Sequence, residues 1–403
     1  MPTKAPIKVK HRRRILGRVT RAEFFGRADA LDEILRHAER IASPRGLLLL
    51  TAPSAGASEL LRQAYDEIFQ RHEDVIPIYF ELNGDATSST GTARQFLYTF
   101  LKQVVAFRRR DPALSNSALT VTELYELTPA SDFEWVENLI QACDREEQSG
   151  DERAFIRLCL SVPGRAALRG ARTVVMIDGL HIAEQLTGEV SLGTEIAHVF
   201  SRAESPFVLA GLRRRVLDLV HGERGSFDSA ASVHLQHLSD EDARSMVENL
   251  AEKTGTDIND QTRDLIVQQF GGNPSFISSM IRAAQEKRLP LNSFRSCQML
   301  YVDEVMGGRF NRHCAAILDA IAPDGKTRNA LIRVLYEAVM SDSVKSPVES
   351  WRKKLGMDSA HVQEIMGGLH VHELVSVNAS VVQKIRLPYV WDDYLHAHYR
   401  LEI

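Results

Sequence analysis

The sequence predicts an α/β protein with a parallel-sheet core, followed by a helical segment and a C-terminal unit that ends in two short strands. Four short, almost uninterrupted apolar runs alternate with amphipathic helical patterns in the first half of the chain. This alternation is typical of a parallel sheet with helices on both faces. Near Val233 the strand patterns give way to helical ones, and helices precede strands again after Phe310.

The strands predicted for the core are residues 47–50, 77–82, 174–177 and 206–211. In the segments that separate these strands, apolar residues recur every three or four positions. This periodicity predicts helices at residues 21–40, 58–69, 92–109, 133–143, 151–167 and 194–203. Residues 111–150 are more polar, and we expect them to form an insertion packed against the main sheet.

The helical segment begins at Ser239, a good N-cap residue with Asp242 three positions later. The run Gly271-Gly272-Asn273-Pro274 predicts a helix stop followed by a proline in a first turn, between helices at 260–270 and 274–286. The predicted elements of the last unit have the order of a winged helix. They are helices at 312–321, 326–340, 347–355 and 359–369, then strands at 374–377 and 384–387 joined by a turn at 378–380.

Composition excludes several classes of protein. The chain has 403 residues, 44% of them apolar and 25% charged, with a formal charge of -4, so we expect two or three soluble domains without a global attraction to nucleic acid or membrane. No apolar run approaches the roughly 18 residues that span a bilayer. The cysteines are far apart in the sequence and form no CxxC pair, which predicts reduced thiols in a cytoplasmic protein and no metal site. They are Cys143, Cys159, Cys297 and Cys314.

The turn after the first predicted strand reads Thr51-Ala52-Pro53-Ser54-Ala55-Gly56-Ala57-Ser58. A phosphate-binding loop needs a strand, a turn of small residues whose amides converge on phosphate, and a helix N-terminus. That context is present, and Gly56 and Ser58 match the pattern G-x-x-x-x-G-K-[ST]. Thr51 replaces its first glycine, and Ala57 replaces its lysine.

With these features, residues 22–285 resemble the AAA+/STAND group of P-loop ATPases, especially the archaeal-type ATPases related to origin-recognition proteins. The order of five motifs carries the resemblance, and a winged helix after the lid fits the group. The motifs are Phe25-Gly26-Arg27-Ala28-Asp29-Ala30-Leu31, the Walker A turn 51–58, Walker B at Val174–Asp178, the sensor 1 strand Pro206–Gly211, and the lid with its Gly271–Pro274 turn.

The resemblance implies a site for ATP or ADP with Mg²⁺. Its expected contacts are Gly26, Arg27, Ser54, Gly56, Ala57, Ser58, Asp178 and Arg213, with Ser58 and Asp178 holding the metal. Two specialised residues are absent, because Ala57 stands where the lysine would be and Gly179 follows Asp178 where a glutamate activates water. We therefore expect a degenerate ATPase with no identifiable catalytic residue.

Two basic regions keep a different interpretation open. Residues 4–21 hold eight lysines and arginines and no acid, so this leader is either a solvated flexible segment or an arm for nucleic acid or an acidic partner. The expected recognition segment of the winged helix, residues 359–366, has no lysine or arginine, whereas DNA reading favours such residues. Weak anchors are available at Arg352, Lys353, Lys354, Lys384 and Arg386.

The resulting prediction has a leader at 1–21, a P-loop core at 22–232, a helical lid at 233–305 and a winged-helix-like unit at 306–403. The favoured function is a non-hydrolysing or slow nucleotide-dependent switch or scaffold for a protein partner or for self-association. One alternative is a DNA-binding regulator that uses the leader and the winged helix. Another is a true ATPase with atypical catalytic residues.

Overall fold

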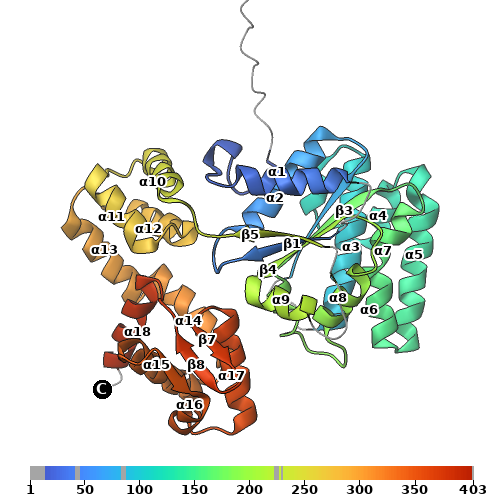
Figure 1. Cartoon of the computed structure of the whole chain (residues 1–403). Helices are drawn as coiled ribbons and strands as arrows, with labels where there is room; N and C mark the ends of the chain where they lie inside the picture. The colour runs from blue at the N-terminus through green and yellow to red at the C-terminus, as the bar shows by residue number, and fades with distance from the viewer. Residues whose placement is uncertain (1–13, 41–45, 83–87, 222–226, 228–229, 402–403) are drawn as a thin grey trace, which may run out of the picture. The chain divides into compact units, whose positions relative to one another are not determined.

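The computed structural model describes residues 14–40, 46–82, 88–221, 227 and 230–401 (Figure 1). The part of the basic leader before Arg14 lies outside these residues. The chain divides into two compact units. The first contains residues 1–49, 57–211 and 216–233, and the second contains residues 50–56, 212–215 and 234–403.

The core is a five-stranded sheet with the order β2-β3-β4-β1-β5. Every residue of β1, β3 and β4 is buried, which explains why the sequence reads there as uninterrupted apolar runs. β2 pairs with β3 in parallel, and β3 with β4 likewise. The strands are β1 (Gly46–Thr51), β2 (Ile76–Glu81), β3 (Thr173–Asp178), β4 (Phe207–Leu212) and β5 (Ala231–Leu235). The four predicted strands are confirmed to within about one residue at each end.

The fifth strand was missed by the sequence analysis. β5 has partly exposed and exposed residues in alternation and only its last residue is buried, so it lacks the apolar run of a central strand. It lies at the edge of the sheet beside β1, and Ala52 N donates to Leu235 O at 3.0 Å just beyond β1. β2 lies at the other edge of the sheet but is buried except at Glu81, so its apolar run was recognisable whereas β5 has none.

Helices cover both faces of this sheet (Figure 1). α1 and α2 lie on one side, with α8 and α9 on the other. The helical elements of the first unit are η1 (Arg21–Glu23), α1 (Ala28–Glu39), α2 (Ala57–Arg71), α3 (Ser89–Arg108), η2 (Pro112–Asn116), α4 (Val121–Leu127), α5 (Ala130–Ser149), α6 (Glu152–Leu160), α7 (Val162–Ala167), η3 (Leu180–Ile182), α8 (Leu192–Phe200) and α9 (Arg213–His221). The predicted helix 151–167 is two helices, because Ser161 and Pro163 interrupt it.

The polar stretch 111–150 forms η2, α4 and α5. We expected it to pack against the main sheet, but its helices pack chiefly on other helices: α4 on α3, and α5 on α6. α5 is amphipathic, and it buries Trp135, Val136, Leu139 and Ile140. The insertion therefore adds a second helical layer outside the one that covers the strands.

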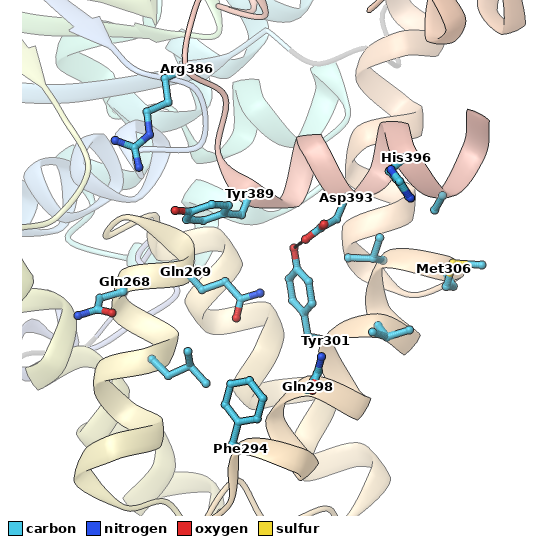
Figure 2. Close-up of a pocket in the computed structure, with 14 residues that line it drawn as sticks. Gln268, Gln269, Phe294, Gln298, Tyr301, Met306, Arg386, Tyr389, Asp393 and His396 are labelled. Atoms are coloured by element: carbon cyan, nitrogen blue, oxygen red, sulfur yellow. Dashed lines mark hydrogen bonds between the residues drawn. The ribbon is translucent and has the colours of Figure 1, made fainter. Parts of the chain in front are cut away.

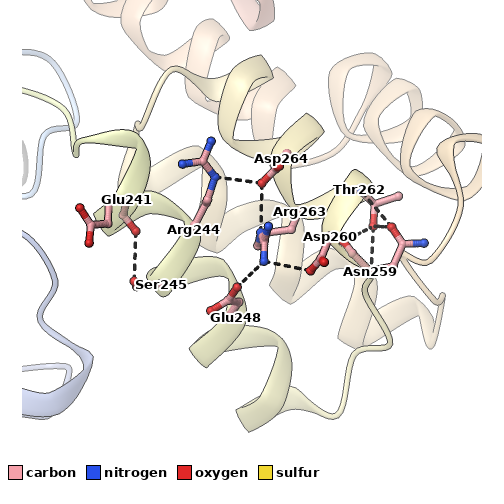
Figure 3. Close-up of polar contacts among 9 residues, drawn as sticks. All are labelled: Glu241, Arg244, Ser245, Glu248, Asn259, Asp260, Thr262, Arg263 and Asp264. Carbon is pink, nitrogen blue, oxygen red and sulfur yellow. Dashed lines mark hydrogen bonds and ion pairs between the residues drawn. The ribbon is translucent and has the colours of Figure 1, made fainter.

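The lid comprises α10 (Asp240–Thr254), α11 (Asp260–Phe270), α12 (Pro274–Lys287) and α13 (Phe294–Met306). Ser239 caps α10 by accepting a hydrogen bond from Asp242 N, and Asn273 caps α12 with Pro274 in its first turn, as the sequence predicts. α13 was not predicted. An ion-pair network in which Arg263 binds Glu248, Asp260 and Asp264 joins α10 to α11 (Figure 3).

The last unit contains α14 (Arg309–Ile321), α15 (Gly325–Met340), β6 (Lys345–Pro347), α16 (Val348–Leu355), α17 (Ser359–Val371), β7 (Val375–Asn378), β8 (Val381–Lys384) and α18 (Tyr389–Leu401). Its antiparallel sheet has the order β6-β8-β7. Helix, strand, two helices and a β-hairpin in this order make a winged helix. The second wing strand lies three residues earlier than predicted, because Asn378 Oδ1 accepts from Val381 N and closes a shorter turn. β6 and α18 were not predicted.

Candidate nucleotide-binding site

The turn between β1 and α2 has the backbone of an anion cradle. Ser54 and Gly56 adopt the left-handed conformation, with φ of 57° and 90°, and Ala55 N donates to Ala52 O at 3.2 Å. Such alternation turns successive amides toward one concave side, and α2, which follows at once, adds the positive end of its dipole. A Cβ at Gly56 would meet only Pro274 Cγ, at 3.8 Å, so the glycine is required by its φ angle and not by crowding.

The first two residues of α2, Ala57 and Ser58, differ in whether their side chains can bind a ligand. Ala57 carries no functional group. Ser58 hydrogen-bonds through its side chain to the carboxylate of Asp178, which ends β3. The sequence-predicted metal pair is thus brought together. A serine hydroxyl beside an aspartate is the donor set that P-loop proteins use for Mg²⁺.

Asp178 is, however, tightly held within the protein. It is only 4% exposed, and the hydroxyl of Tyr79 donates to its Oδ2 at 3.0 Å. Burial raises the pKa of Asp178, and the hydrogen bonds from Ser58 and Tyr79 partly offset that rise. Tyr79 was not singled out in the sequence, because 99 residues separate it from Asp178 and only the pairing of β2 with β3 places them side by side.

A cation and a second carboxylate complete this cluster. Glu81, the last residue of β2, lies opposite Asp178 in the parallel register. The Arg62 guanidinium donates to Glu81 Oε2 at 2.7 Å and lies 5.4 Å from the centre of the Tyr79 ring. Arg62 is buried, and its charge lowers the pKa of Asp178 whereas the charge of Glu81 raises it. Neither residue was among the predicted site residues.

The residue after Asp178 leaves no space for a side chain. Gly179 has a φ of 77°, and a Cβ built on it would lie 2.6 Å from the backbone oxygen of Leu82. Leu82 N donates to Asp178 O at 2.9 Å, so this oxygen belongs to a segment fixed against β3. A backbone atom cannot move aside as a flexible side chain can. The backbone here is therefore built around glycine, and a glutamate does not fit at this position.

The remaining predicted contacts lie on other elements. Gly26 has a φ of 63° and precedes Arg27, which is buried and occupies the N-cap position of α1. In the second unit, Arg213 makes a two-pronged ion pair with Glu373, at 2.5 and 2.8 Å. Arg214 donates to the backbone oxygens of His370 and Val375. The first cation of the run 213–215 is thus bound to a carboxylate of this chain, where the resemblance implied a phosphate.

Comparison with solved structures decides the fold. A Walker-type ATPase of Pyrococcus abyssi superposes with a TM-score of 0.59 over 93% of this chain and 97% of its own, at 11% identity. Two further structures superpose more loosely. They are the Aeropyrum pernix ORC1 protein in complex with DNA (TM-score 0.48, 13% identity, 94% of both chains) and the Thermotoga maritima RuvB Holliday junction branch migration motor (TM-score 0.42, 11% identity, 96% of this chain and 98% of its own). No protein-family model and no curated protein matches the sequence.

The fold is that of a P-loop NTPase. The strand order, the turn after β1 and the aspartate at the end of β3 all have their places in it. The resemblance to P-loop ATPases implies a lysine at position 57 and a glutamate at position 179, where this chain has Ala57 and Gly179. Glu81 is paired with Asp178 in the register of β2 and β3, and its carboxylate is engaged in the ion pair with Arg62.

Other kinds of site find no support in the described part of the chain. Within residues 14–40, 46–82, 88–221, 227 and 230–401, no three histidine, cysteine or acidic side chains are grouped so as to hold a metal ion. All four cysteines are buried and free. None of the described helices has the length and apolar character needed to cross a membrane.

Proposed function

We propose that this protein binds ATP or ADP with Mg²⁺ at its P-loop, turns it over very slowly or not at all, and acts as a nucleotide-dependent switch or scaffold for a protein partner. One observation carries the proposal: the loop keeps the backbone of a phosphate cradle, whereas the position of the catalytic glutamate is closed by Gly179 against Leu82 O. Ser58 and Asp178 are the residues that would hold the metal ion.

Binding can survive the loss of the lysine. A charge-assisted hydrogen bond contributes about 1.5–3 kcal/mol, which corresponds to a roughly 10- to 150-fold weaker nucleotide complex. The backbone cradle and the N-terminus of α2 are independent of that side chain. We therefore expect a dissociation constant in the micromolar range or above.

Turnover needs more than binding. Phosphoryl transfer requires charge neutralisation at the β- and γ-phosphates and a positioned water. Ala57 supplies no charge, and Asp178 is committed to Ser58 and Tyr79. The two acids that follow or flank Asp178 do not replace the missing glutamate: Glu81 is paired with Arg62, and Glu184 is exposed in the turn after η3.

Contacts within the second unit connect the loop to the lid. His237 Nε2 lies within hydrogen-bond distance, 3.1 Å, of Pro53 O in the loop. His237 precedes the N-cap of α10, and Leu238 N donates to Gly272 O in the turn before α12. A phosphate that reorders the turn 52–56 acts directly on the residue to which the start of the lid is bonded. In the proposed switch, phosphate binding would thus change the start of the lid first.

A groove in the second unit offers a surface for the partner (Figure 2). It has a volume of about 910 Å³ and lies between α11, α13 and α18. Phe294, Val302 and Met306 of α13 are 63%, 49% and 46% exposed and share one face of the helix. Under the groove, the Tyr301 hydroxyl, which is hydrogen-bonded to Gln269, donates to Asp393 Oδ2 at 2.6 Å.

The chemistry of this groove suits an amphipathic helix. Its apolar stripe on α13 runs from Phe294 to Met306, about 18 Å or some three turns at 1.5 Å per residue. Asp393 is exposed and, among the described residues, is in no ion pair, so it can receive a lysine or arginine of the bound helix. Amphipathic helices that bind in grooves lay their apolar face against such a surface.

The winged helix gives less support to DNA binding. Arg352 is paired with Glu349 and Lys354 with Glu337, while the Lys384 ammonium donates to the backbone oxygens of Val339 and Ser341. Three of the five basic residues that were candidates for phosphate anchors are therefore engaged within the unit. α17 carries no lysine or arginine, and its exposed His361 is paired with Asp358.

Calorimetric titration with ATP and with ADP, in the presence and absence of Mg²⁺, tests the proposal. We expect saturable binding that is lost in Gly56→Trp, and phosphate release far below the roughly 1–1000 s⁻¹ of ordinary enzymes. Absence of binding to the folded protein at millimolar nucleotide would refute the switch. Rapid turnover that Asp178→Asn abolishes would instead establish an ATPase with atypical catalytic residues.

A further inference from the structure

A second cavity lies in the first unit at the exposed edge of β2. Its volume is about 670 Å³, and it is bounded by β2, α3, residues 115–119 and the N-terminal residues Leu16 and Arg18. The residues that matter for its chemistry are Arg18, Arg62, Tyr98, Thr99 and Lys102. Among the described residues, neither the turn 51–58 nor Asp178 lines this cavity, so it is distinct from the P-loop.

The cavity has more positive than negative charge. Lys102 is partly buried, and its Nζ donates to Ser117 O at 3.1 Å. Among the described residues no carboxylate is in ion-pair distance of Lys102 or of the exposed Arg18 side chain. The one acidic residue in the lining is Glu81, and Arg62 neutralises it at 2.7 Å. Burial lowers the pKa of Lys102, which is what an ammonium without a counterion undergoes.

The N-terminal wall of this cavity is held firmly. Asp66 accepts hydrogen bonds from the amides of Ile15, Leu16 and Gly17, at 2.9, 2.8 and 3.1 Å. Glu59 accepts two more, from the amides of Arg18 and Val19. Asn116 Nδ2 donates to Ile15 O at 3.0 Å and ties the segment to η2. Arg18 is therefore presented to the cavity by a fixed backbone.

We propose that this cavity binds a small organic phosphate, with its phosphoryl group between Lys102 and Arg18. Two cations and the hydroxyls of Tyr98 and Thr99 offer the several donors that a phosphoryl group, with its three acceptor oxygens, requires. The volume exceeds that of inorganic phosphate, and Leu119 and Leu124 supply an apolar wall for an organic body.

Such a ligand would reach the P-loop through Arg62 and Tyr79. Both line the cavity, and both belong to the cluster that holds Asp178. A phosphoryl group near Arg62 competes with Glu81 for the guanidinium and so alters the charge beside Asp178. This regulatory consequence rests on the proposed nucleotide-binding function, whereas the binding of phosphate does not.

Calorimetry with inorganic phosphate and with phenyl phosphate, at 0.15 M salt as a chosen condition, tests the site. The folded protein should bind phenyl phosphate, and bind it more tightly than inorganic phosphate. Lys102→Met, which keeps the apolar stem, should weaken binding about tenfold or more, because a charge-assisted contact is lost. Arg18→Gln should weaken it, and Arg169→Gln, an exposed arginine of the same unit, serves as the matched control and should not.

Two further variants test whether phenyl phosphate binds at the P-loop instead of at this cavity. Phenyl phosphate affinity should be unchanged in Gly56→Trp, with Ser58→Ala as a milder second variant whose fold is checked by circular dichroism. Loss of binding in both would mean that the P-loop is the site and would overturn the proposal. So would equal affinities of the Lys102→Met and unaltered proteins, or no binding at all. ATP titration of Lys102→Met reports separately on the P-loop, so the two proposals fail independently.

Discussion

Replacing Tyr79 by phenylalanine removes the hydroxyl that donates to Asp178 and leaves the ring over Arg62 in place. Asp178 is 4% exposed, so water cannot readily take the place of the lost donor. A hydrogen bond to a charged group contributes about 1.5–3 kcal/mol, and one between neutral groups about 0.5–1.5 kcal/mol. We expect Tyr79→Phe to reduce the free energy of unfolding by an amount in the first range where Asp178 is ionised, and by an amount in the second range where it is protonated.

The loss should depend on pH with a definite sign. Burial raises the pKa of Asp178 in the folded protein above its unfolded value, so the folded state binds the additional proton and the contribution of Asp178 to stability falls as pH rises. The Tyr79 hydroxyl lowers this pKa, and its removal raises the pKa further. The difference between the two proteins should therefore be smaller at acid pH, where a larger fraction of Asp178 is protonated, and grow as the pH rises.

Urea unfolding followed by circular dichroism at several pH values measures this difference. Tyr125→Phe is the matched control: Tyr125 is partly exposed on α4, and its replacement should change stability by less than about 0.5 kcal/mol at every pH. An equally large loss at pH 4.5 and 7.5 would show that Asp178 does not change its charge in this range. If Tyr79→Phe lowers the free energy of unfolding no more than the control does, the Tyr79 hydroxyl does not form a stabilising hydrogen bond with Asp178.

Three further outcomes follow from the site and the groove. Gly179→Ala should destabilise the protein by about 1–3 kcal/mol more than Gly150→Ala in thermal unfolding, because overpacking adds to a similar backbone strain; φ is 77° and 78° at the two positions, but only at Gly179 would the new Cβ meet a backbone atom. Ala57→Lys should tighten Mg-ATP binding about tenfold or more in calorimetry without producing turnover, since the glutamate is still missing. Val302→Asp should abolish binding of a fluorescent basic amphipathic helix to the groove and leave the melting temperature within about 2 °C, because Val302 is 49% exposed.

Local sequence patterns were sufficient for the four strands with long buried runs. The three inner strands β1, β3 and β4 are buried along their whole length, and β2 is buried except at Glu81. The turn at 51–58 was recognisable because small residues follow a strand and precede a helix. β5 and β6 were not predicted, because these edge strands of five and three residues contain no continuous buried apolar run. α13 was not predicted, because apolar residues such as Phe294 and Met306 are exposed. Its sequence therefore lacks a clear separation between an apolar buried face and a polar exposed face.

The decisive features of the site depend on pairing between distant segments. Ser58 and Asp178 could be predicted, since each belongs to a motif. Tyr79 and Glu81 could not be assigned from their own neighbourhood, because what places them beside Asp178 is the register of β2 with β3. A rule that examines the last residues of every strand in a parallel sheet would have found both. The lack of room for a side chain at position 179 follows from the position of Leu82 O, which no sequence pattern specifies.

These dependencies explain why restoring one residue should not restore an ATPase. A lysine at position 57 would meet the β- and γ-phosphates, but the water that attacks phosphorus would still lack a base. A glutamate at position 179 would collide with Leu82 O, which is fixed because Leu82 N is bonded to Asp178 O. Glu81 lies beside Asp178 in the register, yet freeing its carboxylate would leave the buried Arg62 guanidinium without this counterion, which is unfavourable. These contacts are consistent with the proposed site, which binds nucleotide without hydrolysing it, and Arg62 is the residue through which the proposed second anion would influence it.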